Sequence, residues 1–139
     1  MGELAFMIPE IEEFAGALMA VVRDASVQSN DRALLPSAGY ALAQRWAKAA
    51  REKSPVDFAR VLIPDIVDDT VFYLLRAIDE GTLRLSYTAS SGNTVDLTSQ
   101  GLGELAGWFA GSDGWREAYA KERFVDDLSD STGNLPANE

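Results

Sequence analysis

Hydrophobic residues recur at helical spacing in two stretches near the N-terminus. From Glu10 to about Ser29 they fall every three or four positions, which places them on one side of a helix with 3.6 residues per turn. A second stretch, from Ala38 to about Lys53, gathers Leu42, Trp46 and two alanines on one face and basic residues on the other. The pattern therefore predicts two amphipathic helices.

A third helical region follows and contains a proline. Ser54 is followed directly by proline, which is typical of a helix N-terminus, whereas Pro64 disfavours helical geometry in the residue before it. We therefore expect a short helix, a break or kink before Pro64, and a second helix from Asp65 to about Glu80. Gly81 is placed to end this helix in a left-handed conformation.

After this glycine the pattern alternates between apolar and polar residues. Leu83, Leu85 and Tyr87 point to one side of an extended strand, and the turn residues 90–93 lead into a second alternating stretch. The sequence predicts an antiparallel β-hairpin. Because two strands alone are marginally stable in water, we expect the apolar face of the hairpin to lie against helices.

The remaining chain predicts two shorter helices and a polar end. Helical spacing resumes at residues 99–110 and again at 115–121, and residues 129–139 are rich in polar and turn-forming types, which predicts a frayed tail. We expect one domain, residues 1–128. Its fold class is α+β and mostly helical, with a helical N-terminal part, one antiparallel β-hairpin and two shorter C-terminal helices.

Composition narrows the classes of function. The 139 residues include 22 acidic and 12 basic side chains, and the net charge of -10 repels nucleic acids and anionic membranes. A basic protein is therefore the expected macromolecular partner. The chain has neither cysteine nor histidine, so disulfides and catalysis by a thiolate or a Ser-His pair are excluded, and we expect no cofactor. The apolar run 4–8 is too short for a signal peptide or membrane span, so a cytoplasmic protein is expected.

Charge is also distributed unevenly along the chain. Residues 33–60 carry five bases and two acids, whereas residues 61–139 carry five bases and 14 acids. The second predicted helix is thus a basic segment in an acidic chain.

The predicted helix from Asp65 to Glu80 is the most acidic element. At roughly 100° per residue, its apolar residues fall on one side. The opposite side holds Asp65, Asp68, Asp69, Arg76, Asp79 and Glu80. Because the apolar stripe is expected to face the core, we predict that these aspartates face solvent.

Phe72 is the exception, because it falls among the carboxylates. One interpretation is that residues 4–8 or a loop cover it, and the other is that it anchors a partner inside an acidic rim. The leading hypothesis is a non-catalytic cytoplasmic protein-binding domain, such as an immunity or antitoxin-like protein, that recognises a basic partner. The candidate partner-binding residues are Phe72, Asp65, Asp68, Asp69, Arg76 and Asp79.

Two alternatives remain open. Carboxylates spaced three and four residues apart on helices hold metal ions in some helical nucleotide hydrolases. The candidate ligands for such an enzyme are Asp65, Asp68, Asp69, Glu10 and Glu13. The other alternative is a homodimer whose interface uses the alanine-rich second helix, with the basic face of this helix against an acidic surface of the neighbour.

A glycine-rich motif has a structural interpretation. Residues 101–106 spell GxGxxA, the spacing of a dinucleotide-binding turn. The strand before it belongs to a hairpin and no parallel strand follows, so we interpret the glycines as points of flexible helix entry and close packing.

The second half of the chain resembles a group of known proteins. The run from VDDTVFYLLRAIDEG (67–81) to ERFVDDL (122–128) is similar to the C-terminal part of small acidic bacterial proteins without an assigned role. The run holds no catalytic signature, so the resemblance implies a bacterial setting and no mechanism.

Overall fold

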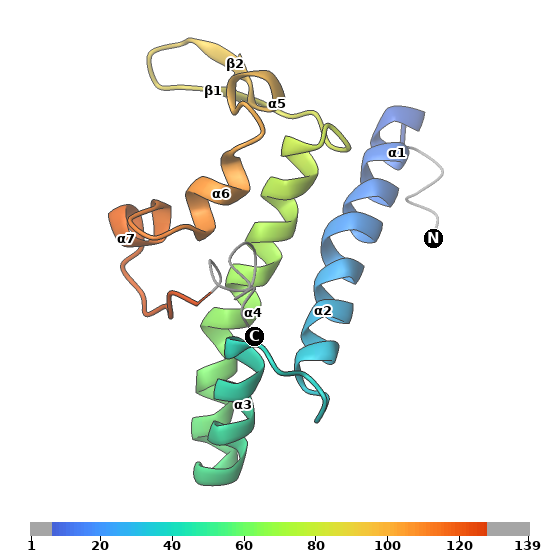
Figure 1. The fold of residues 1–139 in the computed structure, drawn as a ribbon. Coiled ribbons are helices and arrows are strands. Elements are labelled where there is room, and N and C mark those ends of the chain that lie inside the picture. Colours follow the sequence, from blue (N-terminus) through green and yellow to red (C-terminus); the bar gives the residue numbers. More distant parts are fainter. Residues whose placement is uncertain (1–6, 128–139) are drawn as a thin grey trace.

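The computed structural model describes residues 7–127, so the predicted tail and most of the apolar run 4–8 lie outside the described residues. The first helical region is continuous and longer than predicted. It consists of α1 (Pro9–Leu18), a π-helical segment η2 (Met19–Asp24) and α2 (Ala25–Ala33). Together they run alongside the long helix α4 (Figure 1).

The two helices that follow lie side by side in the lower part of Figure 1. These are α3 (Ala41–Glu52) and α4 (Pro55–Asp79), which correspond to the second and third predicted helical regions. As predicted, Ser54 caps α4, since its hydroxyl accepts a hydrogen bond from the backbone N–H of Asp57 at 3.2 Å.

The predicted break before Pro64 is wrong, because α4 continues through this residue. Proline lacks the N–H that would bond to the carbonyl of Arg60 four residues earlier. The guanidinium of Arg123 donates to this carbonyl instead, at 2.8 Å. A distant side chain thus replaces the missing helical hydrogen bond.

The hairpin is confirmed, with shorter strands than the alternating pattern predicted. Strands β1 (Ser86–Thr88) and β2 (Thr94–Asp96) pair antiparallel beyond the C-terminal end of α4 (Figure 1). Gly81 has the predicted left-handed conformation, with φ +82°. Leu83 is buried but Tyr87 is 60% exposed, so the base of the hairpin packs on helices and its strands extend into solvent.

The predicted helix at residues 99–110 is divided into two. They are α5 (Leu97–Gln100) and α6 (Leu105–Ala110), and the last helix is α7 (Trp115–Tyr119). Leu102 and Gly103 separate α5 from α6 with φ values of 58° and 73°, which do not occur in a right-handed helix.

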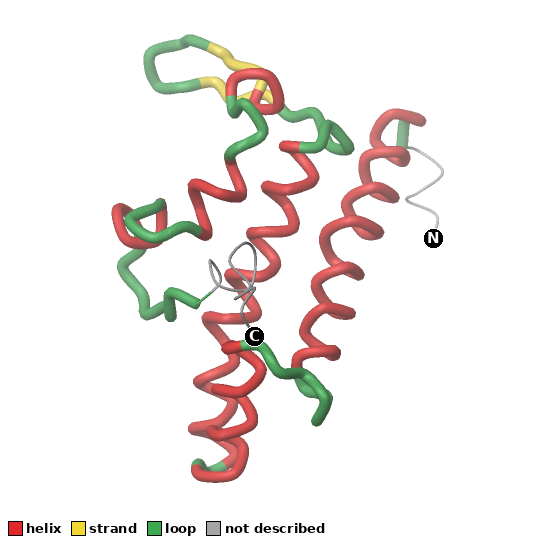
Figure 2. The backbone as a smooth tube through the Cα atoms, in the orientation of Figure 1, coloured by secondary structure: helices red, strands yellow, loops and turns green. Residues whose placement is uncertain are grey.

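Helix α4 contributes to all three parts of the hydrophobic core. Near its C-terminal end it packs against η2, the base of the hairpin and α6; near its N-terminal end it packs against α2 and α3; and between these ends it packs against α6. The α1–α2 region, α3 and α6 therefore surround α4 at different heights, as the tube in Figure 2 shows. The buried members of the three clusters are Val22, Ala77, Ile78, Leu83 and Leu105; Ala33, Leu42, Ala43 and Trp46; and Phe109 and Ala110.

The predicted fold class is confirmed: the protein is mostly helical, with one two-stranded antiparallel hairpin and short C-terminal helices. Within residues 7–127, no helix has both the length and the hydrophobicity that crossing a bilayer requires.

Candidate functional site

Asp65 lies in the interior, which contradicts the predicted outward orientation. It is only 3% exposed. Its carboxylate accepts hydrogen bonds from the indole Nε1 of Trp46 at 2.7 Å and from Nη1 and Nη2 of Arg45 at 2.8 and 3.2 Å. Helix α3 therefore covers a side of α4 that the hydrophobic pattern predicted to face solvent.

Arg45 links two carboxylates from distant parts of the chain. Besides Asp65 it contacts Asp127, to which Nε and Nη2 donate at 3.0 and 2.9 Å. Burial opposes the charged form of the Arg45 guanidinium, but hydrogen bonds from it to both carboxylates outweigh this effect and raise its pKa. The guanidinium is therefore a permanent cation that joins α3, α4 and the segment after α7.

Asp68 is also engaged inside the molecule, on a different side of α4. It accepts a hydrogen bond at 3.2 Å from Nη1 of Arg116, a side chain that is only 4% exposed. The same guanidinium donates to Asp126 and to three backbone carbonyls. Burial raises the pKa of Asp68, although the charge of Arg116 opposes this shift.

Asp69 turns toward α2. One of its oxygens accepts hydrogen bonds from the amide of Asn30 at 3.0 Å and from the hydroxyl of Ser26 at 3.3 Å. Burial raises the pKa of Asp69, and the hydrogen bonds from α2 oppose this shift without cancelling it. The three clustered aspartates thus have partners on three different elements.

The other candidate partner-binding residues are divided between α6 and the surface. Asp79 accepts hydrogen bonds from the backbone N–H groups of Leu105 and Ala106, at 3.0 and 2.9 Å, and so caps the start of α6. Phe72 is half-buried against α6, and most of residues 4–8, the predicted cover, lie outside the described residues. Arg76 is exposed and pairs with Glu80 at 3.0 Å. The six residues therefore do not form one surface.

The carboxylates of the metal-site alternative do not converge. Glu10 and Glu13 are exposed on α1, whereas the three aspartates of α4 turn toward α3, α7 and α2. Among residues 7–127, no group of three or more acidic side chains has an arrangement that would hold a metal ion.

The homodimer alternative placed the basic face of α3 against an acidic surface of a neighbour, and it stays a prediction. The alanine-rich face of α3 is largely used within the chain. Ala43 and Ala49 are buried, and Ala43 belongs to the cluster formed with α2 and α4. The opposite, basic side of α3 stays at the surface.

Sequence reasoning missed an apolar groove between the first helical region and α4. It has a volume of about 460 Å³, and its walls include Leu18, Met19, Val22, Val27 and Ile66. Met19, Val27 and Ile66 are 43%, 46% and 37% exposed. We refer to this feature as the apolar groove.

The π-helical segment explains why the periodic pattern did not predict the groove. A π-helical turn holds an additional residue, so it shifts the direction of the side chains that follow relative to an α-helix. Met19 opens this segment and Val27 follows it. A signal was present on α4, because Ile63, Ile66 and Val67 have the spacing of one helical face and all three are exposed, and Ile66 lines the groove.

The first helical region, which forms one wall of the apolar groove, is mainly acidic, although the charged residues that line the groove itself are Arg23 and Asp31. The helical region 9–33 carries five acids and two bases, and one of these bases, Arg23, pairs with Asp24 at 2.7 Å. Glu10, Glu12 and Glu13 are exposed on α1, next to the exposed apolar residues Ile11 and Phe14. The first helical region thus presents apolar side chains between carboxylates.

Comparison of the chain with known protein families, with curated proteins and with solved structures finds no match. The resemblance of residues 67–128 to small acidic bacterial proteins stays a prediction.

Proposed function

We propose that the protein is a non-catalytic protein-binding domain whose apolar groove takes an amphipathic helix of a basic partner. The observation that carries the proposal is the exposure of Met19, Val27 and Ile66 along one groove of a chain with a net charge of -10. Exposed apolar side chains that line a groove are typical of interaction sites.

The apolar part of the groove favours a helical ligand. A helix binds in such a groove by burying the residues of its own apolar face, which recur every three or four positions. The groove is formed between two helical elements, and π-helical segments such as η2 are frequent at functional sites.

Charge favours a basic partner over a second copy of this chain. Two copies of the chain would each carry a net charge of -10. Like charges across an interface oppose association, whereas lysine and arginine beside the apolar face of a partner helix would be attracted. An immunity or antitoxin-like role agrees with this mode of binding.

Fluorescence anisotropy with synthetic helical peptides tests the proposal. Three labelled peptides of equal length share one leucine face and carry lysine, glutamine or glutamate on the polar face. The lysine peptide should bind most tightly and the glutamate peptide most weakly. Val27→Glu should weaken binding of the lysine peptide by about tenfold or more, because a charged side chain then occupies the apolar groove.

The matched control is Val56→Glu. Val56 is 63% exposed at the start of α4 and does not line the groove. Both variants make the chain more acidic, so a purely electrostatic attraction would strengthen lysine-peptide binding in both. Unchanged or tighter binding by Val27→Glu would overturn the proposal, as would an equal loss in the two variants.

A further inference from the structure

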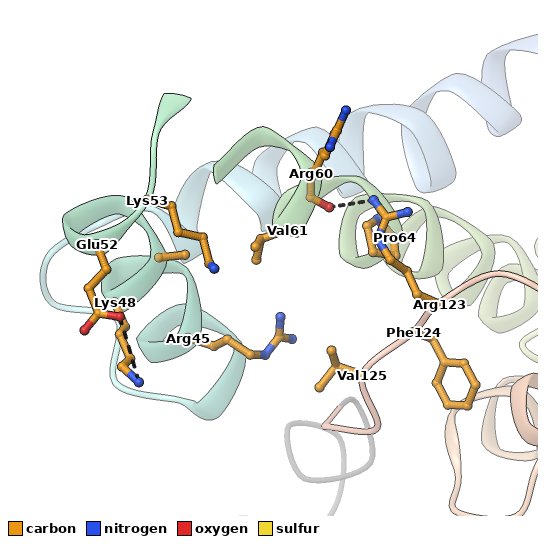
Figure 3. A pocket seen from close by; sticks show the side chains of 11 residues that line it. Arg45, Lys48, Glu52, Lys53, Arg60, Val61, Pro64, Arg123, Phe124 and Val125 are labelled. Atoms are coloured by element: carbon orange, nitrogen blue, oxygen red, sulfur yellow. Dashed lines mark hydrogen bonds and ion pairs between the residues drawn. The ribbon is translucent and has the colours of Figure 1, made fainter. Parts of the chain in front are cut away.

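A second cavity lies away from the apolar groove. It is lined by α3, the N-terminal half of α4 and residues 123–125 (Figure 3), is partly open to solvent and has a volume of about 380 Å³. This volume is in the range of small-molecule sites. We refer to it as the basic pocket.

The basic pocket concentrates positive charge in an acidic protein. Five of the chain's 12 basic residues line it, with one acidic residue, Glu52, which gives a formal excess of four positive charges. The five are Arg45, Lys48, Lys53, Arg60 and Arg123. Because lysine and arginine on neighbouring walls repel one another, such a cluster is favourable only when anions compensate it.

Protein carboxylates compensate only part of this charge. Asp65 and Asp127 pair with Arg45, Glu52 lies 4.0 Å from the ammonium of Lys48, and Glu122 lies 3.9 Å from the guanidinium of Arg123. The backbone N–H of Lys53 donates to the Ala49 carbonyl, but the ammonium of Lys53 makes no hydrogen bond or ion pair with any of residues 7–127. In Figure 3 the Lys53 ammonium and the Arg45 guanidinium extend toward the space between α3 and Val61, whereas the Arg60 side chain turns away from it.

Residues 123–125 form the opposite wall of the pocket, and a hydrogen bond to α4 holds them in place. Because Arg123 donates to the Arg60 carbonyl, the segment that carries Phe124 and Val125 is held against α4 (Figure 3). This segment adds apolar surface to the pocket. The remaining apolar walls are Ala49, Val61 and Pro64.

From this arrangement we infer that the basic pocket binds a small phosphomonoester, with its phosphate at Lys53 and its apolar body on Val61, Pro64 and Val125. The site is independent of the apolar groove and of the proposed protein partner. A phosphomonoester carries close to two negative charges at neutral pH and several acceptor oxygens. It therefore matches a pocket with surplus cations better than a monoanionic carboxylate does.

Titration followed by ¹H–¹⁵N NMR tests the inference with defined probes. The probes are phenyl phosphate, benzoate, phenol and inorganic phosphate, each added at constant ionic strength. Saturable shifts in the amide signals of residues 45–64 and 123–125 are expected with phenyl phosphate, weaker ones with inorganic phosphate, and the weakest with benzoate and phenol. Lys53→Gln should weaken phenyl phosphate binding by about tenfold, as expected for the loss of one charge-assisted contact.

Lys121→Gln is the matched control, because Lys121 is exposed, lies outside the pocket and carries the same charge. It should change the affinity by less than about twofold, since an exposed charge that does not contact the ligand is screened by salt. Benzoate binding as tight as phenyl phosphate would overturn the assignment of the ligand class. Equal losses of phenyl phosphate affinity in the two lysine variants, or no saturable shift with phenyl phosphate, would contradict the assignment of the binding site.

Discussion

At the scale of single residues, Asp65 is the side chain whose environment differs most from a surface carboxylate. It is buried against α3, where Arg45 and Trp46 supply three hydrogen bonds. Replacing one member of a buried ion pair leaves the other charged and poorly solvated, which costs more than the pair itself contributes. The position of α3 on α4 therefore depends on this carboxylate.

Asp65→Asn should lower the free energy of unfolding by about 3 kcal/mol, because Arg45 loses the more buried of its two carboxylate partners. Urea unfolding followed by circular dichroism measures this quantity. Asp24→Asn is the control, since it removes a carboxylate from an exposed arginine–aspartate pair and should cost less than about 1 kcal/mol. Equal losses in the two variants would show that the Asp65 contacts do not hold α3 in place.

Asp69 predicts a pH dependence with a defined sign. Burial raises its pKa in the folded protein above the ordinary value of 3.8, so the folded state binds a proton more readily than the unfolded state. Between these two pKa values the contribution of Asp69 to stability falls as pH rises, and at neutral pH its charged form carries the full cost of burial.

The stability of the unmodified protein relative to Asp69→Asn should therefore decrease between about pH 4 and about pH 7. Urea unfolding of both proteins at the two pH values gives this difference. Asp31→Asn, at an exposed carboxylate of α2, should show a much smaller trend. A difference that increases with pH would contradict the predicted direction of the pKa shift.

At the scale of elements, helix α4 depends on a hydrogen bond from outside the helix. Pro64 leaves the Arg60 carbonyl without its helical donor, and Arg123 supplies a replacement. The same contact fixes the segment that closes the basic pocket. Helix continuity and the shape of the pocket are therefore coupled.

A double-mutant cycle tests this coupling. Arg123→Met should destabilise the protein by about 1 kcal/mol, the usual net contribution of one hydrogen bond. The loss should be smaller in a Pro64→Ala background, because the backbone N–H that this change introduces bonds to the Arg60 carbonyl. Unfolding in urea gives all four free energies. An equal effect of Arg123→Met in both backgrounds would mean that the two residues act independently.

The elements that the sequence predicted well are those with local determinants. The Ser54 cap, the left-handed Gly81 and the hairpin each depend on residues within a few positions of one another. Such local determinants can be recognised in the sequence. The glycine interpretation also agrees with the structure, since a Cβ on Gly101 would lie 2.6 Å from the Leu97 carbonyl oxygen. Helix α4 through Pro64 was missed because its replacement donor, Arg123, lies far along the chain.

At the scale of the whole molecule, charge and apolar surface divide the protein into two regions. The apolar groove lies beside the acidic first helical region, and the basic pocket lies between α3, α4 and residues 123–125. The sequence indicated the charges of both regions but neither cavity. A helical wheel assumes that one side of a helix faces the core, whereas α4 is covered by several elements. Asp65, Asp68 and Asp69 therefore turn inward, and Ile66 and Val67 are exposed.

Binding of a basic helix in the apolar groove is the central claim, and NMR mapping tests it most directly. A ¹H–¹⁵N titration with the lysine-faced peptide should shift the amide signals of Met19, Val27 and Ile66 in a saturable way. Signals of Lys53 and Val61 in the basic pocket should change little, and Val27→Glu should abolish the shifts. Shifts spread over the acidic surface without the groove residues, or shifts that persist in Val27→Glu, would contradict the claim.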